Sequence, residues 1–205
     1  MFINTIIVTG IASKAGKTTL ITKILRDLSK ITDRIGAIKC SINIDFTKQL
    51  ITDQPEVVNK EGTDTARIEQ AGSAHTILIK SNRNQVEDAF NEARKLLKNV
   101  TYLLIEGNSA VKYLPADLIV YLDREDLEMK KSAEEAKEKA DIIINTRDLF
   151  IKKEISEIPF RFNLDIINCP KALLLATIMD RKPILIGKQL NKEKVKLKGC
   201  QLGFF

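Results

Sequence analysis

Short apolar runs alternate with amphipathic stretches along most of the chain. The runs are continuous and rich in Ile and Val, a pattern typical of β-strands that are buried on both faces of a sheet. They predict strands over residues 5–9, 34–39, 76–80, 102–106, 118–123 and 142–145.

The stretches between these strands have the spacing of amphipathic helices. In one of them Val86, Phe90 and Ala93 fall on a single stripe, as on a helix that packs against a sheet. Strands that alternate with helices predict an α/β fold: a three-layer, mostly parallel sheet with helices on both faces. Ligands of such sheets bind beyond the carboxyl ends of the strands. The predicted helices cover residues 18–29, 64–71, 86–98 and 130–140.

Two parts of the chain depart from this alternation. Residues 41–61 are polar with little periodicity, which predicts a long loop with a short helix. After the last predicted strand the pattern becomes irregular. We therefore expect a main domain over residues 1–150 and a small C-terminal extension over residues 151–205 that packs on the same domain. Within the extension the sequence predicts a helix over residues 170–179 and a strand over residues 183–186.

The composition is that of a globular protein with a modest basic excess. With 44% hydrophobic and 29% charged residues, a chain of 205 residues can fold without metal or disulfide staples. The net charge of +6 suits an anionic ligand but is too small and dispersed to indicate a nucleic-acid binder. A run of basic residues between Arg181 and Lys198 is either a solvated surface or a tail that contacts a partner.

Nothing in the sequence predicts a membrane segment or a metal cluster. No apolar run approaches the roughly 20 residues of a membrane span, and no signal peptide is recognisable, so we expect a cytoplasmic location. Cys40, Cys169 and Cys200 are too far apart to indicate a zinc site or a disulfide framework, although a Cys40 thiol beside a nucleotide could be reactive. The sole histidine, His75, has no second His or Cys nearby, which favours a structural role.

The segment between the first predicted strand and the first predicted helix has the pattern of a P-loop, or Walker A motif. Backbone N–H groups of such a loop converge on a polyphosphate at the N-terminus of a helix, where the helix dipole favours negative charge. Lys17 would supply a point charge to the β- and γ-phosphates, and the Thr18 hydroxyl a ligand for Mg²⁺. The candidate phosphate-binding residues are Gly10, Ser13, Lys14, Ala15, Gly16, Lys17, Thr18 and Thr19.

The spacing of this loop departs from the common form. Five residues, instead of four, separate Gly10 from Gly16, and Ile11 stands where the first glycine is usual. A strand–turn–helix with a chance Gly-Lys-Thr is the alternative, but the apolar strand before the loop and the helix after it favour the P-loop. Lys14 lies within the longer loop, where it would add a second cation to the phosphates or reach a dimer partner.

Two further segments carry acids that would face the loop. Glu106 ends an apolar strand, where an acid can hold Mg²⁺ or its water shell, although many strands end in a charge. Asp64 opens a predicted helix, where an N-cap explains it equally well, and Arg67 lies one turn further on, within reach of a phosphate. Thr18 and Glu106 are therefore candidate metal ligands, and Lys17, Asp64 and Glu106 candidate catalytic residues.

A third motif follows the last predicted strand. Asn145-Thr146-Arg147-Asp148 resembles the Asn-Lys-x-Asp motif of GTPases, in which the Asp carboxylate accepts hydrogen bonds from two donors of guanine that adenine lacks. Asn145, Asp148 and also Arg67 are thus candidate nucleotide-binding residues, and GTP is favoured over ATP. Thr146 departs from the usual Lys, and a strand followed by an Asp N-cap is the alternative.

Together these motifs resemble the SIMIBI class of P-loop NTPases, and most closely the MobB-like family of adaptors in molybdopterin-guanine dinucleotide biosynthesis. Two features depart from that family: Cys40-Ser41 stands where a His-containing segment is usual, and the loop spacing is closer to dethiobiotin synthetase. Residues 140–149 are similar to nickel-insertion GTPases, whose His and Cys clusters are missing here. The segments that carry the resemblance are residues 16–20, 35–39, 62–67, 71–73 and 104–107.

The resemblance implies a GTP-binding protein of cofactor biosynthesis or metalloenzyme maturation, with slow, Mg²⁺-dependent hydrolysis. It also implies a homodimer, because the class often pairs across the nucleotide face. Two alternatives stay open. One is an ATP-dependent small-molecule kinase or ligase of the dethiobiotin synthetase type. The other is an adaptor that does not hydrolyse nucleotide, in which nucleotide binding controls contacts with a partner protein.

Overall fold

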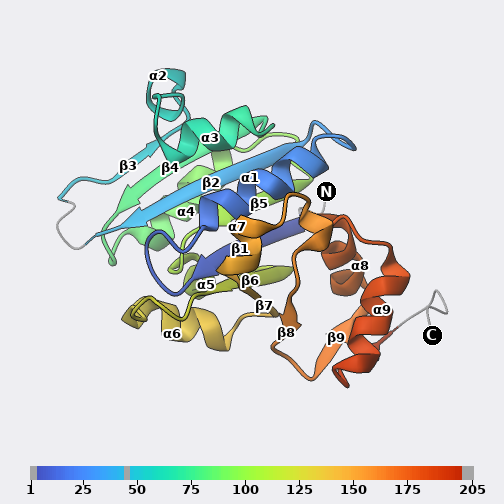
Figure 1. Ribbon diagram of the computed structural model, residues 1–205. Helices are drawn as coiled ribbons and strands as arrows, with labels where there is room; N and C mark the ends of the chain where they lie inside the picture. Colours follow the sequence, from blue (N-terminus) through green and yellow to red (C-terminus); the bar gives the residue numbers. More distant parts are fainter. Residues whose placement is uncertain (1–3, 44–46, 200–205) are drawn as a thin grey trace.

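The computed structural model describes residues 4–43 and 47–199, and an eight-stranded sheet forms its centre (Figure 1). The strands of this sheet are β1 (Asn4–Gly10), β2 (Ile35–Ile42), β3 (Leu50–Thr52), β4 (His75–Ser81), β5 (Tyr102–Glu106), β6 (Leu118–Asp123), β7 (Ile142–Asn145) and β8 (Arg161–Phe162). They lie in the order β3-β4-β2-β5-β1-β6-β7-β8. Neighbouring strands are parallel except at the two edges, where β3 and β8 each pair antiparallel with their neighbour.

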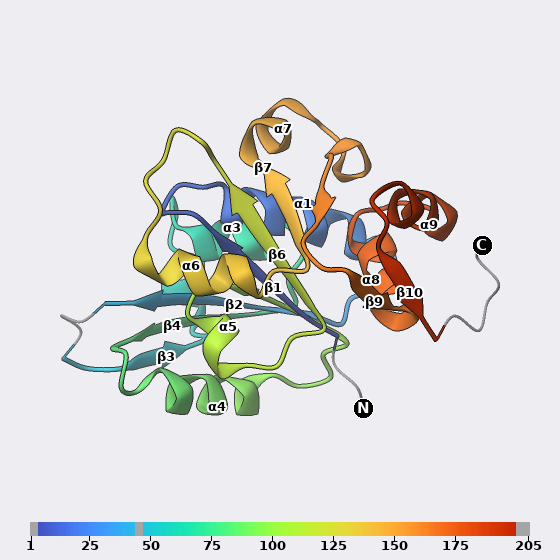
Figure 2. The same cartoon turned by 90° about the horizontal axis from the view of Figure 1, so that it is seen from below.

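Helices cover both faces of the sheet (Figures 1 and 2). The connections from β1 to β2 and from β2 to β4 run along the sheet in one direction, and those from β4 to β5, β5 to β6 and β6 to β7 run in the other. Right-handed crossovers therefore place their helices on opposite faces. One face carries α1 (Lys17–Leu28), α3 (Asp64–Gln70) and α8 (Cys169–Ile178). The other face carries α4 (Val86–Leu96), α5 (Ala110–Tyr113) and α6 (Lys131–Glu138).

Strand β1 lies at the centre of the core. It pairs with β5 on one side and β6 on the other, and its residues Ile6, Ile7 and Val8 have no exposed surface. Burying a side chain of this size contributes roughly 1.5–3 kcal/mol. The loop that follows Gly10 therefore begins from one of the most rigidly held points of the molecule.

The predicted α/β architecture is confirmed. The six predicted strands are present as β1, β2, β4, β5, β6 and β7, and the four helices of the main domain as α1, α3, α4 and α6. The predicted loop over residues 41–61 contains the expected short helix, α2 (Pro55–Val58), but also the edge strand β3. This strand is too short to show a hydrophobic period. Residues 44–46 of the same loop lie outside the described residues.

The C-terminal extension differs from the prediction in one element. The expected helix is present as α8, which packs against α1 and β6, but the strand predicted over residues 183–186 is wrong because this segment begins α9 (Pro183–Lys192). A short apolar run cannot distinguish a strand from a buried helix, and Pro183 stands at the helix start that its fixed φ favours. The remaining elements are α7 (Thr146–Ile151), the 3-10 turn Ile155–Glu157, β9 (Ile166–Asn168) and β10 (Lys196–Lys198).

Strands β9 and β10 form a separate two-stranded parallel sheet. The division of the chain at residue 150 stays a prediction. Within the part of the chain that the structure describes, none of the helices combines the length and apolar character needed to cross a bilayer.

Candidate nucleotide-binding site

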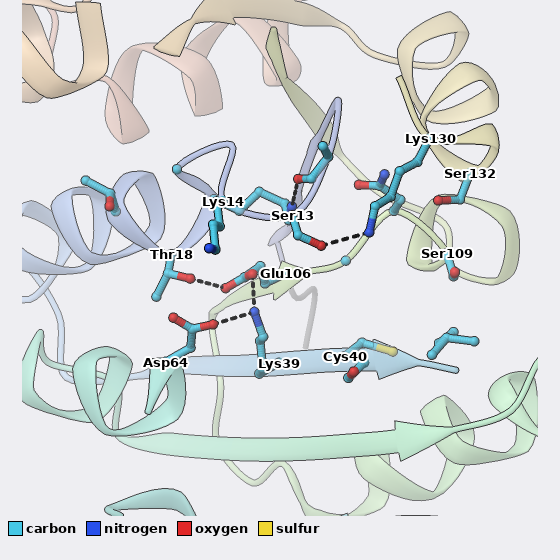
Figure 3. Close-up of a pocket in the computed structure, with 18 of the residues that line it drawn as sticks. Ser13, Lys14, Thr18, Lys39, Cys40, Asp64, Glu106, Ser109, Lys130 and Ser132 are labelled. Carbon is cyan, nitrogen blue, oxygen red and sulfur yellow. Dashed lines mark hydrogen bonds and ion pairs between the residues drawn. The ribbon is translucent and has the colours of Figure 1, made fainter. Parts of the chain in front are cut away.

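A cavity of about 680 Å³ opens at the carboxyl ends of β1, β2 and β5 (Figure 3). We call it the P-loop cavity. Six of the eight residues predicted to bind phosphate line it. These are Ser13, Lys14, Gly16, Lys17, Thr18 and Thr19, and the predicted residues Asp64, Arg67 and Glu106 line it as well.

The P-loop ends at a glycine whose backbone has left-handed φ and ψ angles. Gly16 has φ 89° and is the N-cap of α1, and a Cβ added to it would lie 2.9 Å from Leu149 Cδ2. Any other residue there would be strained and would collide with α7. The Lys17 ammonium follows directly and donates to the Ala12 carbonyl at 2.7 Å. Burial lowers the pKa of Lys17 below its ordinary value, although the charge of Glu106 opposes the shift.

Gly10 and Ala15, the other two predicted residues, shape the loop without lining the cavity. The Gly10 N–H donates to Asn108 Oδ1 at 3.0 Å, and Asn108 Nδ2 donates to the Gly10 carbonyl at 2.9 Å. Ala15 is fully buried, and a Cβ on Gly10 would lie 3.2 Å from the Ala15 Cβ. Asn108 therefore fixes the start of the loop, a role that the sequence analysis did not find.

Four polar side chains form a continuous chain of contacts across the floor of the cavity (Figure 3). The Thr18 hydroxyl donates to Glu106 Oε2 at 2.8 Å, and the Lys39 ammonium forms an ion pair with Glu106 Oε1. Lys39 also donates to Asp64 Oδ2 at 2.8 Å. Burial alone would lower the pKa of Lys39, but the Glu106 charge and the hydrogen bonds to both carboxylates raise it above its ordinary value.

The acid at the start of α3 is available for this chain because another residue caps the helix. The Thr63 side chain accepts from the Ala66 N–H at 3.2 Å, so Thr63, and not Asp64, is the N-cap. Burial raises the pKa of Asp64, but hydrogen bonding and charge from Lys39 outweigh it and lower the pKa overall. Arg67 lies beside Asp64, with 3.6 Å between Nη1 and Oδ1, and its Nη2 donates to Thr19 Oγ1 at 3.4 Å.

The oxygen atoms of Thr18 and Glu106 fit a Mg²⁺ ion that is shared with a phosphate. The two side chains lie within hydrogen-bond distance of each other, and hydroxyl and carboxylate oxygens are the ligands that this hard cation prefers. Among the described residues, no three or more His, Cys, Asp and Glu side chains group together as a metal site. This donor set therefore suits Mg²⁺ that keeps waters and phosphate oxygens in its shell, not a cage made by protein alone.

A comparison with protein-family models matches residues 5–143 to MobB, molybdopterin guanine dinucleotide synthesis protein B. The chain belongs to this family. The MobB family binds nucleotides and serves molybdenum-cofactor biosynthesis, and the predicted membership of the P-loop NTPases is confirmed. The matched segment contains the whole P-loop cavity except Phe150. A search among curated proteins finds no match.

Two cations of this MobB-like cavity were not found by sequence reasoning. Lys39 ends the strand predicted over residues 34–39, although β2 continues to Ile42, and a charge at the end of an apolar run is the signal that could have found it. Lys130 lies before α6 and gives no such signal. Its ammonium donates to Ser13 Oγ at 2.8 Å, its backbone N–H donates to the Ile11 carbonyl at 3.1 Å, and it forms no ion pair among the described residues.

Asn145 and Asp148 lie together in a second cavity of about 450 Å³, which we call the α7 cavity. It is separate from the P-loop cavity, and Asn145 and Asp148 lie beyond the segment that matches MobB, although part of the lining, such as Asp123, lies within that segment. Asn145 Oδ1 accepts from the Arg147 N–H at 2.9 Å, so Asn145 is the N-cap of α7. Thr146, which replaces the usual Lys, is fully buried and donates to the Asp123 carbonyl at 2.7 Å. The structure thus groups the two predicted base-binding residues but does not bring them into the P-loop cavity.

Helix α7 connects the two cavities. Leu149 and Phe150 both approach Gly16, and Phe150, which is 58% exposed, lines the P-loop cavity while Asp148 lines the α7 cavity. A nucleotide whose phosphates lie at Gly16 would therefore have α7 as its neighbour.

The structure also locates His75 and two of the three cysteines. Cys40 lines the P-loop cavity, but burial raises the pKa of its thiol to about 12. His75 begins β4 at the opposite end of the sheet, where it pairs in register with Gly36. Cys169 is buried in the C-terminal extension, and Cys200 lies outside the described residues.

Proposed function

We propose that the chain binds a nucleoside triphosphate with Mg²⁺ in the P-loop cavity and hydrolyses it slowly in the service of molybdenum-cofactor biosynthesis. The observation that carries this proposal is the convergence of Lys17, Thr18 and Glu106 at a loop closed by Gly16. A buried ammonium, a hydroxyl and a carboxylate at the N-terminus of a helix are the groups that triphosphate and Mg²⁺ require together.

Each residue would have a separate task. The Lys17 ammonium would leave the Ala12 carbonyl and bind the β- and γ-phosphates. Charged phosphate oxygens accept hydrogen bonds from an ammonium more strongly than a neutral carbonyl does. Thr18 and Glu106 would hold Mg²⁺, which supplies neutralisation of phosphate charge when bound. Arg67 and Lys130 approach the loop from opposite sides, through Thr19 and Ser13, and would stabilise the charge of the terminal phosphate.

The base proposed for this nucleotide is guanine. Asn145 and Asp148 lie together at the end of β7, and Asp148 Oδ atoms are not used by the N-cap of α7, which is formed by Asn145. A carboxylate that stays available in this way supports a contact with the two guanine donors. We also propose that the protein acts as a homodimer, as its resemblance to the SIMIBI class implies.

A second candidate is group transfer to a small molecule, of the kinase or ligase type. The P-loop cavity extends beyond Glu106 to a polar end lined by Ser109, Lys130 and Ser132 (Figure 3). A lysine with three hydroxyls near it, including that of Ser13, supports binding of a second polar substrate there.

Calorimetric titration of the purified protein tests the proposal. GTP, ATP and GDP are each titrated with Mg²⁺ and with EDTA, and phosphate release is followed separately. We expect GTP to bind more tightly than ATP, with an affinity that falls when Mg²⁺ is removed. Absence of binding for every nucleotide would contradict the proposal, and a preference for ATP that is accompanied by turnover only with an added acceptor would favour the second candidate.

A further inference from the structure

Lys39 is held by two carboxylates at the centre of the P-loop cavity. It pairs in register with Glu106 across the parallel strands β2 and β5, so strand pairing places the two residues side by side. Its ammonium contacts Glu106 Oε1 and Asp64 Oδ2, as Figure 3 shows. The register of the two strands fixes the backbone positions from which these side chains meet. The contact therefore forms without any movement of the sheet.

The consequence concerns the carboxylate that we assign to Mg²⁺. Glu106 is only 2% exposed, and its two oxygens are both engaged, one by Lys39 and the other by the Thr18 hydroxyl. A buried carboxylate is stable only when its charge is compensated, and Lys39 provides this compensation before any ligand arrives. A Mg²⁺ ion that approaches alone must compete with an ammonium that is already in place.

We propose that Lys39 is a positioning residue that makes Mg²⁺ binding depend on the nucleotide. Its ammonium, together with Arg67 beside Asp64, offsets the negative charge of Glu106 and Asp64, so that the cavity without nucleotide attracts Mg²⁺ only weakly. A triphosphate brings its own negative charge and oxygen ligands, and the ion then enters with it. This inference rests on the proposed function, since it assumes that Mg²⁺ and a triphosphate share the P-loop cavity.

The test is a Mg²⁺ titration of the nucleotide-free protein, followed by calorimetry and by the melting temperature. We expect no saturable Mg²⁺ binding at millimolar concentrations in the wild type. Lys39→Met keeps the unbranched stem but removes the charge, and should gain a nucleotide-independent site. Its Mg²⁺ affinity should rise by about tenfold or more, within the range usual for coupling between sites.

Two variants control this experiment. Lys80→Met removes the charge of an exposed lysine on the neighbouring strand β4 and should leave Mg²⁺ affinity unchanged. Lys39→Met combined with Glu106→Gln should lose the gained site, because the carboxylate that attracts the ion is removed. Lys39→Arg, which keeps the positive charge, should behave like the wild type.

Several outcomes would overturn the inference. Tight Mg²⁺ binding by the nucleotide-free wild type would do so without any variant, and so would a folded Lys39→Met protein that gains no site. Nucleotide binding in the presence of Mg²⁺ is measured in parallel. Its absence would contradict the proposed function, whereas normal nucleotide binding with unchanged Mg²⁺ affinity in Lys39→Met would contradict the role of Lys39 alone.

Discussion

The P-loop cavity and the α7 cavity both lie at carboxyl ends of strands, but their polar groups are held in different ways. In the P-loop cavity the contacts join residues that are far apart in the chain, from Thr18 to Glu106 and from Lys39 to Asp64. The register of β2 and β5 also places Lys39 beside Glu106. Each of these residues therefore depends on the others, and their substitutions should not be additive.

Several contacts of the α7 cavity are local, although Asp123 on its wall also pairs with Lys137 and accepts a hydrogen bond from Thr146. Asn145 accepts from the Arg147 N–H two residues away, and Arg124 forms an ion pair with Asp126 at 2.7 Å. Such contacts survive small movements of the surrounding elements because both partners move together. We therefore expect phosphate binding to depend on the sheet, and the proposed base recognition to depend on a short helix that Asn145 caps at its start.

The largest effect should come from Lys17→Ala. Its partly buried ammonium contacts the loop backbone, and a triphosphate would lose its main compensating charge. Loss of one partner of a buried charge pair costs about 2–5 kcal/mol, so affinity for Mg·GTP should fall by more than about 30-fold in calorimetry.

Lys30→Ala is the matched control for this substitution. Lys30 follows α1 at its other end, pairs with Asp27 and is exposed, so nucleotide affinity should not change. Retention of normal affinity by Lys17→Ala would show that the P-loop cavity is not the phosphate site, and the comparison between the two cavities would lose its basis.

A smaller effect, confined to base preference, should come from Asp148→Ala. Hydrogen bonds from guanine donors to a carboxylate contribute about 1.5–3 kcal/mol, so the preference for GTP over ATP should fall by roughly tenfold to a hundredfold. Binding of inorganic tripolyphosphate, which has no base, should be unchanged.

Glu125→Ala removes another acid that lines the α7 cavity and serves as the control. An unchanged ratio of GTP to ATP affinity in Asp148→Ala would contradict the assignment of guanine recognition to this cavity. It would leave phosphate binding in the P-loop cavity unaffected.

The difference between the two cavities also explains what the sequence could predict. The P-loop, Glu106 and Asp64 are recognisable because strand ends and helix starts bring such groups to one edge of a parallel sheet. Lys39, at the end of a predicted strand, fits this rule as well. Lys130 does not, because its place depends on how the segment before α6 returns to Ser13, and neither hydrophobic period nor spacing specifies that path.

The same limit applies to the fold. Strands with several buried residues, such as β1 and β6, are predicted within a residue or two, whereas the three-residue edge strand β3 is missed. In the extension, the apolar run that begins at Pro183 fits a strand or a helix equally well. Packing, which the sequence does not show, decides for α9.

A modest effect on stability should come from Asn145→Ala. Loss of an N-cap costs about 1 kcal/mol, which urea unfolding can measure. Asn168→Ala is a matched control, because the Asn168 side chain is also an N-cap: it accepts from the Lys171 N–H, three residues on, at 2.9 Å. Both variants should lose similar stability, but only Asn145→Ala should also weaken GTP binding. Equal nucleotide affinity in the two variants would show that Asn145 acts only as a helix cap.

The smallest effect should be seen in the reactivity of the Cys40 thiol toward alkylation. This prediction tests whether the positive charge of the P-loop cavity activates a thiol on its wall. The charge of Lys39 favours the thiolate, but burial dominates and raises the pKa of Cys40 to about 12. The charged form is therefore present only as the pH approaches that value, and at pH 7.5 the side chain stays a thiol. Since thiolates are the species that react with iodoacetamide, mass spectrometry of the native protein should find Cys40 unmodified, whereas the urea-unfolded protein should be labelled there. Rapid labelling of the native protein would show that this wall of the cavity is open to water and more strongly influenced by the lysines than its burial implies.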